Sequence, residues 1–133
     1  MTSKVEYLGS LRTESEHLQS GSKMITDAPV DNHGKGEAFS PTDTVANALA
    51  TCMLTVMGIK ADALEIDMKG TTAEVTKTMA AEPRRISKIE VNIKFPGSYD
   101  EKVTKILENT ARNCPVLHSL NPGIKKLITF SYS

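Results

Sequence analysis

Apolar and polar residues alternate in short, uneven runs over the first part of the chain, a pattern typical of β-strands. Apolar side chains mix with polar neighbours over 5–11, the half-polar stretch 13–18 keeps an extended pattern, and a Ser-Gly-Ser turn at 20–22 precedes a returning strand at 23–26. Two glycines, a proline and an Asp-Asn pair at 28–36 favour a loop. The pattern therefore predicts a small antiparallel meander followed by a loop.

A long helix is predicted to begin at Pro41. Ser40 is a preferred N-cap residue, proline is favoured at the first helical position, and Asp43 places an acid at the third. Downstream, the apolar residues form two adjacent rows at helical spacing: Val45, Leu49, Cys52, Val56 and Ile59 in one, and Ala46, Ala50, Met53 and Met57 in the other. Two apolar rows indicate a central helix that is covered on most sides and needs more cover than one chain supplies.

The rest of the chain predicts strands and a second helix. The expected elements are strands at 64–68, 72–79 and 86–95, an amphipathic helix at 99–113, a short helical turn at 116–120 and a closing strand at 124–132. The order of elements predicts one α+β domain over residues 1–133.

Composition and charge exclude several classes of protein. The 133 residues are 39% hydrophobic and 24% charged, close to an ordinary soluble domain. Sixteen basic residues balance sixteen acidic ones, which argues against nucleic acid or an anionic membrane as the main partner. The N-terminus resembles no signal peptide, and the most apolar stretch, 45–59, is shorter than the roughly 20 residues of a membrane span. We therefore expect a cytoplasmic protein.

The two cysteines are the candidate reactive residues of the chain. They are too few for a disulfide framework, and their spacing matches no metal motif. Cys52 lies in the middle of the predicted helix, where a cysteine is usually a small apolar residue. Cys114 precedes Pro115 at a predicted helix start, where free N–H groups favour a thiolate. Local chemistry therefore predicts Cys114 as the more acidic thiol and leaves open whether the two cysteines meet.

Two segments resemble motifs of one family. The sequence from Ser40 to Cys52, SPTDTVANALATC, resembles the helix that carries the peroxidatic cysteine in the OsmC/Ohr family, the osmotically inducible and organic hydroperoxide resistance proteins. The sequence from Cys114 to Leu120, CPVLHSL, is similar to the family's Cys-Pro-Val segment with the second cysteine. The turn at 83–86 and the long strand after it also fit. Both motifs in this order make the chain similar to the family, in its OsmC-like branch.

The resemblance implies a fold and an activity. The fold would be OsmC-like, with antiparallel β-sheets around a long central helix plus a second helix, in an intertwined homodimer with sites at the subunit interface. The activity would be that of a thiol peroxidase without haem, flavin or metal, acting on organic hydroperoxides or hydrogen peroxide. Cys52 would attack and become a sulfenic acid, and Cys114 would condense with it to a disulfide. An external dithiol, often of the dihydrolipoamide type in the family, would restore both thiols.

The sequence departs from the family at the group that activates the thiolate. In hydroperoxide resistance proteins this group is an Arg held by a Glu near the helix start. Here Thr42 follows Pro41, and the acid comes one position later as Asp43. Arg12, on an early strand, is the only arginine before the helix. Asp43 and Arg12 are therefore the candidates, although Asp43 is equally explained as a helix N-terminal charge.

Other residues have both a functional and a structural interpretation. His17 and His118 are candidates for proton transfer, although a histidine is more often packed or solvated. Met53 and Met57 either fill the core or line an apolar pocket for an organic peroxide. His33 with Asp31 and Asn32 is either a candidate metal site or a set of ordinary turn residues, and the Arg84-Arg85 pair fits a solvated turn.

Two other functions belong to different classes. A non-catalytic OsmC-like protein would bind a small apolar or thiol-reactive ligand in its pocket, and the missing Arg–Glu pair favours this alternative. A structural dimer would bury both thiols in an inert state.

Overall fold

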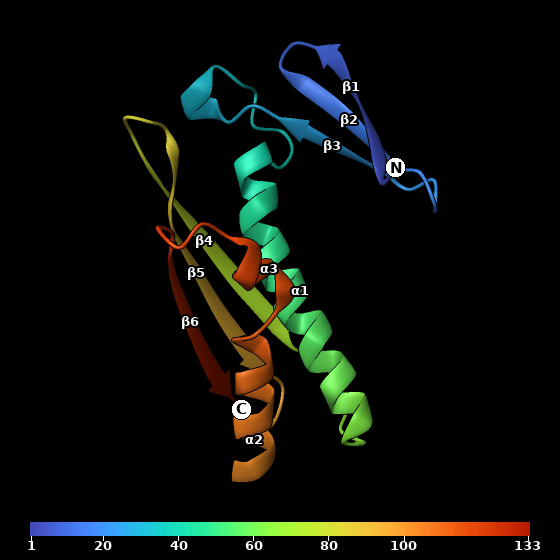
Figure 1. The fold of residues 1–133 in the computed structure, drawn as a ribbon, viewed down its shortest axis with the longest axis vertical. Coiled ribbons are helices and arrows are strands. Elements are labelled where there is room, and N and C mark those ends of the chain that lie inside the picture. The colour runs from blue at the N-terminus through green and yellow to red at the C-terminus, as the bar shows by residue number, and fades with distance from the viewer. The chain divides into compact units, whose positions relative to one another are not determined.

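The structure, a computed structural model, describes residues 1–133, which divide into two compact units, Met1–Val45 and Ala46–Ser133. Its elements are β1 (Ser3–Gly9), β2 (Arg12–His17), β3 (Lys23–Asp27), the 3-10 helix η1 (Val30–Asn32), α1 (Pro41–Ala63), β4 (Thr72–Ala80), β5 (Arg85–Phe95), α2 (Glu101–Ala111), α3 (Pro115–Ser119) and β6 (Lys125–Tyr132). Figure 1 shows these elements in chain order from blue to red. The boundary between the units falls inside α1, and the prediction of a single domain over 1–133 stays a prediction.

The first unit contains the predicted meander, β1-β2-β3, with both strand pairs antiparallel. Alternation places Val5, Tyr7 and Met24 on one face and mostly charged residues on the other. These three side chains stay 59%, 64% and 45% exposed, respectively. The residues that the unit does bury are polar ones, Thr26, Asp27 and Ser40. The meander therefore lacks an apolar core of its own.

The loop before α1 folds back tightly on itself. The Gly34 N–H donates to the Pro29 carbonyl at 2.9 Å. A Cβ atom at position 34 would lie 1.7 Å from the Ala28 carbonyl oxygen, so only glycine fits there.

A reciprocal capping box starts α1, as the sequence predicts. Ser40 Oγ accepts from the Asp43 N–H at 3.0 Å, and Asp43 Oδ2 accepts from the Ser40 N–H at 3.0 Å. The prediction of a strand at 64–68 is wrong, because the turn that closes α1 and a connection without regular structure occupy this stretch. The Ile66 N–H donates to the Ala61 carbonyl at 2.9 Å while Glu65 has φ 58, the closure of a Schellman motif.

The apolar stretch 45–59 is shorter than a membrane span, but the whole of α1 is long enough for one. Its 23 residues meet the length and hydropathy criteria for a membrane span, which the core helix of a soluble protein also meets. The buried residues of α1 join the main hydrophobic core: Ala46, Leu49, Ala50, Met53, Met57 and Ala61. The structure thus gives α1 the role of a core helix.

The second unit packs helices on one face of the sheet β4-β5-β6 (Figure 1). The buried face of β5 consists of Ile89, Val91, Ile93 and Phe95. It shares one core with α1, with Leu107 and Ala111 of α2, and with Cys114. The fold class is therefore α+β, as predicted. The expectation of purely antiparallel sheets needs one correction, because β6 runs parallel to β5 after the chain has crossed through α2 and α3.

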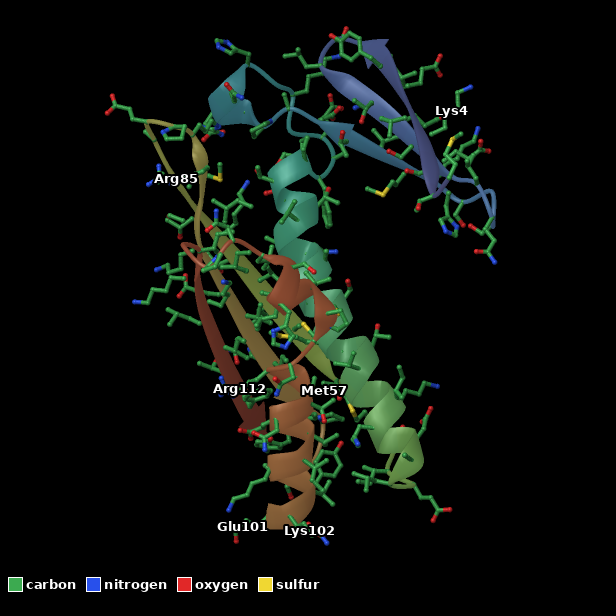
Figure 2. All side chains as sticks on the ribbon, viewed as in Figure 1. Lys4, Met57, Arg85, Glu101, Lys102 and Arg112 are labelled. Carbon is green, nitrogen blue, oxygen red and sulfur yellow. The ribbon has the colours of Figure 1, made fainter.

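Aromatic residues fix the end of α2 that leads to Cys114. The Tyr132 hydroxyl donates to Glu108 Oε2 at 2.6 Å, and the ring of Tyr132 stacks on Phe95 with centroids 4.8 Å apart. The Arg112 guanidinium lies 5.2 Å from the centroid of the Phe130 ring, a cation–π contact between the end of α2 and β6 (Figure 2). These contacts hold the chain in place just before the second cysteine.

Candidate functional site

The second unit brings the two cysteines together. Cys52 comes from the middle of α1 and Cys114 from the residue before α3, and both are free thiols. Cys52 packs against the hydrophobic core that contains Cys114, and interaction with Cys52 raises the pKa of the Cys114 thiol, so the two side chains are neighbours. This contact answers the question that the sequence left open.

Cys114 occupies the predicted helix start. It is the N-cap of α3, its Sγ accepts from the Leu117 N–H at 3.4 Å, and Pro115 follows at the first helical position. The side chain is fully buried, with 0% exposure. Burial raises the pKa of the Cys114 thiol, the hydrogen bond from the Leu117 N–H lowers it, and the neighbouring Cys52 raises it again. The net direction is upward.

The prediction of Cys114 as an acidic thiol is therefore wrong. The N-terminus of a five-residue helix does favour a thiolate locally, but desolvation disfavours the charged form more strongly. Cys114 is a buried thiol that keeps its proton at neutral pH.

Cys52 is the more accessible of the two cysteines. Its side chain is half-buried, and the next residue, Met53, is fully buried in the core. Met57 is also fully buried and lies on the side of α1 toward α2 (Figure 2). The two methionines therefore fill the core, and a reagent from solvent reaches Cys52 more easily than Cys114.

Arg12 belongs to an ion pair that the sequence interpretation missed. Its Nε and Nη2 atoms donate to the two carboxylate oxygens of Asp27 at 2.7 and 2.8 Å, and the Glu37 N–H donates to Asp27 Oδ2 at 3.2 Å. The hydrogen bond to Arg12 lowers the pKa of Asp27, and the same bond raises the pKa of Arg12. Arg12 and Asp27 are direct cross-strand partners, so the hairpin register would have revealed the pair.

The role of Arg12 toward Cys52 stays a prediction, because the two residues belong to different compact units. Asp43 acts structurally in the capping box with Ser40, which fits its interpretation as a helix N-terminal charge. A role for Asp43 in activating the thiol also stays a prediction.

The histidines have ordinary surroundings. His17 Nδ1 is hydrogen-bonded to Ser20 Oγ at 2.6 Å, next to the turn after β2. His33 follows η1 with φ 68, and His118 is an exposed residue of α3. The structure contains no group of three or more His, Cys, Asp or Glu side chains that could hold a metal ion.

The chain matches the sequence profile of the OsmC-like proteins over residues 34–127. A candidate osmotic-stress-induced and detoxification-response protein from Psychrobacter arcticus 273-4 is 58% identical, with a TM-score of 0.95 over 98% of this chain and 95% of that one. No curated protein sequence matches the chain.

Two more distant crystal structures share the fold. The organic hydroperoxide resistance protein OsmC of Legionella pneumophila is 15% identical, with a TM-score of 0.75 over 98% of this chain and 97% of that one. An organic hydroperoxide resistance protein of Elizabethkingia anophelis is 14% identical, with a TM-score of 0.76 over 100% of this chain and 97% of that one. The family profile and the 58% identity to the Psychrobacter protein lead to one conclusion: this chain belongs to the OsmC-like protein family.

Proposed function

We propose that the protein is a thiol-dependent peroxidase that reduces organic hydroperoxides, and hydrogen peroxide as a smaller substrate. The observation that carries the proposal is that Cys52 and Cys114, which are far apart in the sequence, lie next to each other in the hydrophobic core. Membership of the OsmC-like family and the names of the hydroperoxide resistance proteins with the same fold support a redox role.

In the first step the Cys52 thiolate attacks the terminal oxygen of the hydroperoxide R–O–O–H. A sulfur–oxygen bond forms and the oxygen–oxygen bond breaks. The alkoxide RO⁻ leaves and takes up a proton to become the alcohol. Cys52 loses two electrons and becomes a sulfenic acid, and the peroxide is reduced. The greater accessibility of Cys52 than of the fully buried Cys114 supports Cys52 as the attacking residue.

In the second step Cys114 resolves the sulfenic acid. Its sulfur bonds to the Cys52 sulfur, the hydroxyl group leaves, and the thiol proton converts this group to water. Burial raises the pKa of Cys114 and keeps it protonated, so that the proton is available for this step. An external dithiol, such as one of the dihydrolipoamide type, then reduces the disulfide by two exchange steps. The cycle needs no metal and no organic cofactor.

We further propose that the protein works as a cytoplasmic homodimer with one domain in each chain. Large apolar side chains stay exposed in each unit of the single chain, with Tyr7 64% and Ile59 66% exposed. A second copy would cover such residues. Arg12, held by Asp27, is the proposed counter-charge for the Cys52 thiolate, and Asp43 is a second candidate.

Peroxide consumption by matched variants tests the mechanism. With cumene hydroperoxide and a dithiol, Cys52→Ser should lose turnover entirely. Cys114→Ser, reduced beforehand and assayed without the dithiol, should consume about one peroxide per chain and accumulate a sulfenic acid that dimedone traps. The double variant Cys52→Ser/Cys114→Ser gives the background. Full steady-state turnover by Cys52→Ser would contradict the proposal.

The second candidate function is a non-catalytic member that binds a small apolar or thiol-reactive ligand. The observation that favours it is Thr42 at the position where hydroperoxide resistance proteins carry the Glu that holds the activating Arg. This function predicts no peroxide consumption by the wild type, whereas the peroxidase predicts consumption that depends on Cys52.

A further inference from the structure

The C-terminal half of α2 is joined to β6 at two points. Glu108 and Arg112 are one helical turn apart, so their side chains leave the same face of α2. Glu108 Oε2 accepts from the Tyr132 hydroxyl at 2.6 Å. The Arg112 guanidinium lies 5.2 Å from the centroid of the Phe130 ring, and Arg112 marks this end of α2 in Figure 2. A hydrogen bond and a cation–π contact therefore hold helix and strand together directly before Cys114.

Tyr132 is itself fixed in place. Its ring stacks on Phe95, with the two ring planes 1° apart and Phe95 only 2% exposed. Burial and the hydrogen bond to Glu108 raise the pKa of Tyr132 well above the ordinary tyrosine value, so the hydroxyl keeps its proton and remains a donor. The stacked ring thus determines where the hydroxyl lies, and the hydroxyl determines where Glu108 lies.

The chain is held unequally on the two sides of Cys114. On the side of α2, the Cys114 N–H donates to the Ala111 carbonyl at 3.4 Å, and Ala111 is fully buried in the core. On the other side, α3 has only five residues and none of them is buried. The Cys114 sulfur caps α3 by accepting from the Leu117 N–H. Because α3 depends on the sulfur for its own cap, the position of the sulfur is determined mainly by α2.

We propose that Tyr132 and Glu108 are positioning residues that set the rate at which Cys114 resolves the Cys52 sulfenic acid. The inference rests on the proposed function. In this step the Cys114 sulfur bonds to the Cys52 sulfur, the sulfur–oxygen bond of the sulfenic acid breaks, and its hydroxyl leaves as water with the proton of the Cys114 thiol. The rate of such a step depends steeply on how the reacting atoms are held, so an anchor on α2 acts on it through the chain.

The first step of the cycle should not depend on this pair. Cys52 belongs to α1, and the buried Met53 and Met57 hold α1 in the core. Tyr132 and Glu108 belong to β6 and α2. Loss of their hydrogen bond should therefore leave the attack of Cys52 on the peroxide unchanged and slow only the formation of the disulfide.

Single-turnover oxidation separates the two steps. Reduced protein is mixed with a few equivalents of cumene hydroperoxide without a dithiol, quenched in acid at intervals and weighed intact. The first step adds one oxygen atom, and its rate rises with the peroxide concentration. The second step converts this species to one that has lost two hydrogen atoms, and its rate does not depend on the peroxide concentration.

The variants remove one side of the hydrogen bond at a time. Tyr132→Phe removes the hydroxyl and keeps the stacked ring, Glu108→Ala removes the acceptor, and Glu108→Gln keeps an oxygen acceptor. The matched control is Tyr99→Phe. The Tyr99 hydroxyl donates to the Asp67 carbonyl at 3.1 Å, and its ring contacts Phe95 with centroids 5.7 Å apart. The control thus loses one hydroxyl from the same aromatic cluster, at the other end of α2.

The expected loss is confined to the second step. Tyr132→Phe and Glu108→Ala form the sulfenic acid at the wild-type rate and convert it to the disulfide about tenfold more slowly, the effect of one hydrogen bond to a charged group. The double variant Tyr132→Phe/Glu108→Ala is no slower than either single variant, because both remove the same interaction. Glu108→Gln restores most of the rate, and Tyr99→Phe keeps the wild-type rates of both steps.

Three results would overturn the inference. They are a wild-type rate of disulfide formation in Tyr132→Phe, an equal loss in Tyr99→Phe, and additive losses in the double variant. Failure of the proposed peroxidase appears separately, as a wild-type protein in which peroxide forms neither the sulfenic acid nor the disulfide, and the inference then falls with it.

Discussion

The substitution Met53→Ala tests whether the helix that carries Cys52 is held by packing or borders a substrate pocket. Met53 is 0% exposed and belongs to the core that α1 shares with the inner face of β5. Truncation of a buried methionine removes its transfer free energy and leaves a cavity, at a cost of about 2–5 kcal/mol in the free energy of unfolding. For a domain of this size each kcal/mol lowers the melting temperature by about 3–5 °C.

The assay is thermal unfolding followed by circular dichroism, with all proteins at one concentration because association shifts the melting temperature. A loss of about 3.5 kcal/mol, the middle of this range, should lower the melting temperature of Met53→Ala by roughly 10–18 °C. The matched control is Leu127→Ala on the outer face of β6, where the side chain is 38% exposed and the loss should stay below about 1 kcal/mol. An unchanged melting temperature for Met53→Ala, together with a higher KM for cumene hydroperoxide, would refute the packing role and make Met53 part of a pocket wall.

Two further predictions concern the first unit. Ser40→Ala removes the acceptor of the Asp43 N–H and should lower the free energy of unfolding by about 0.5–2 kcal/mol. Ser40→Asp, which keeps a side-chain acceptor, should retain most of the wild-type stability. Chemical denaturation measures both differences. The ion pair with Arg12 lowers the pKa of Asp27 in the folded protein. The pair therefore stabilises the fold fully above the pKa of an unfolded Asp, about 3.9. This stabilisation is lost as the pH falls through the lower pKa that Asp27 has in the folded protein. Urea unfolding between about pH 6 and pH 2 should therefore show a steeper loss of stability in the wild type than in Asp27→Asn, and parallel curves would contradict this reasoning.

Most helices and strands could be predicted from the sequence because they are determined by residues close together in the chain. The capping box that starts α1 needs only Ser40 and Asp43, and the alternation of Ile89, Val91 and Ile93 defines one buried face of β5. The strand predicted at 64–68 was wrong because alternation of apolar and polar residues is not unique to strands. Here a Schellman motif and the connection after it place Ile66 and Met68 against the core. The parallel direction of β6 depends on how α2 and α3 cross the sheet, which no local pattern encodes.

The sequence likewise predicted some features of the candidate site and not others. The family resemblance indicated Cys52 and Cys114, and the structure brings their side chains together. The acidity of Cys114 was predicted wrongly, since burial depends on the whole core and outweighs the local helix terminus. Asp27 was missed because its importance arises from its register opposite Arg12 and from its near-complete burial.

The mass of the intact protein after peroxide treatment shows whether Cys52 and Cys114 form a disulfide. Reduced wild-type protein is treated with one equivalent of cumene hydroperoxide, quenched in acid and weighed by mass spectrometry before and after dithiothreitol. The proposed mechanism predicts a loss of two hydrogen atoms per chain, reversed by dithiothreitol, with a peptide map that joins Cys52 to Cys114. An unchanged mass, or the addition of oxygen to Cys52 without a disulfide, would contradict it.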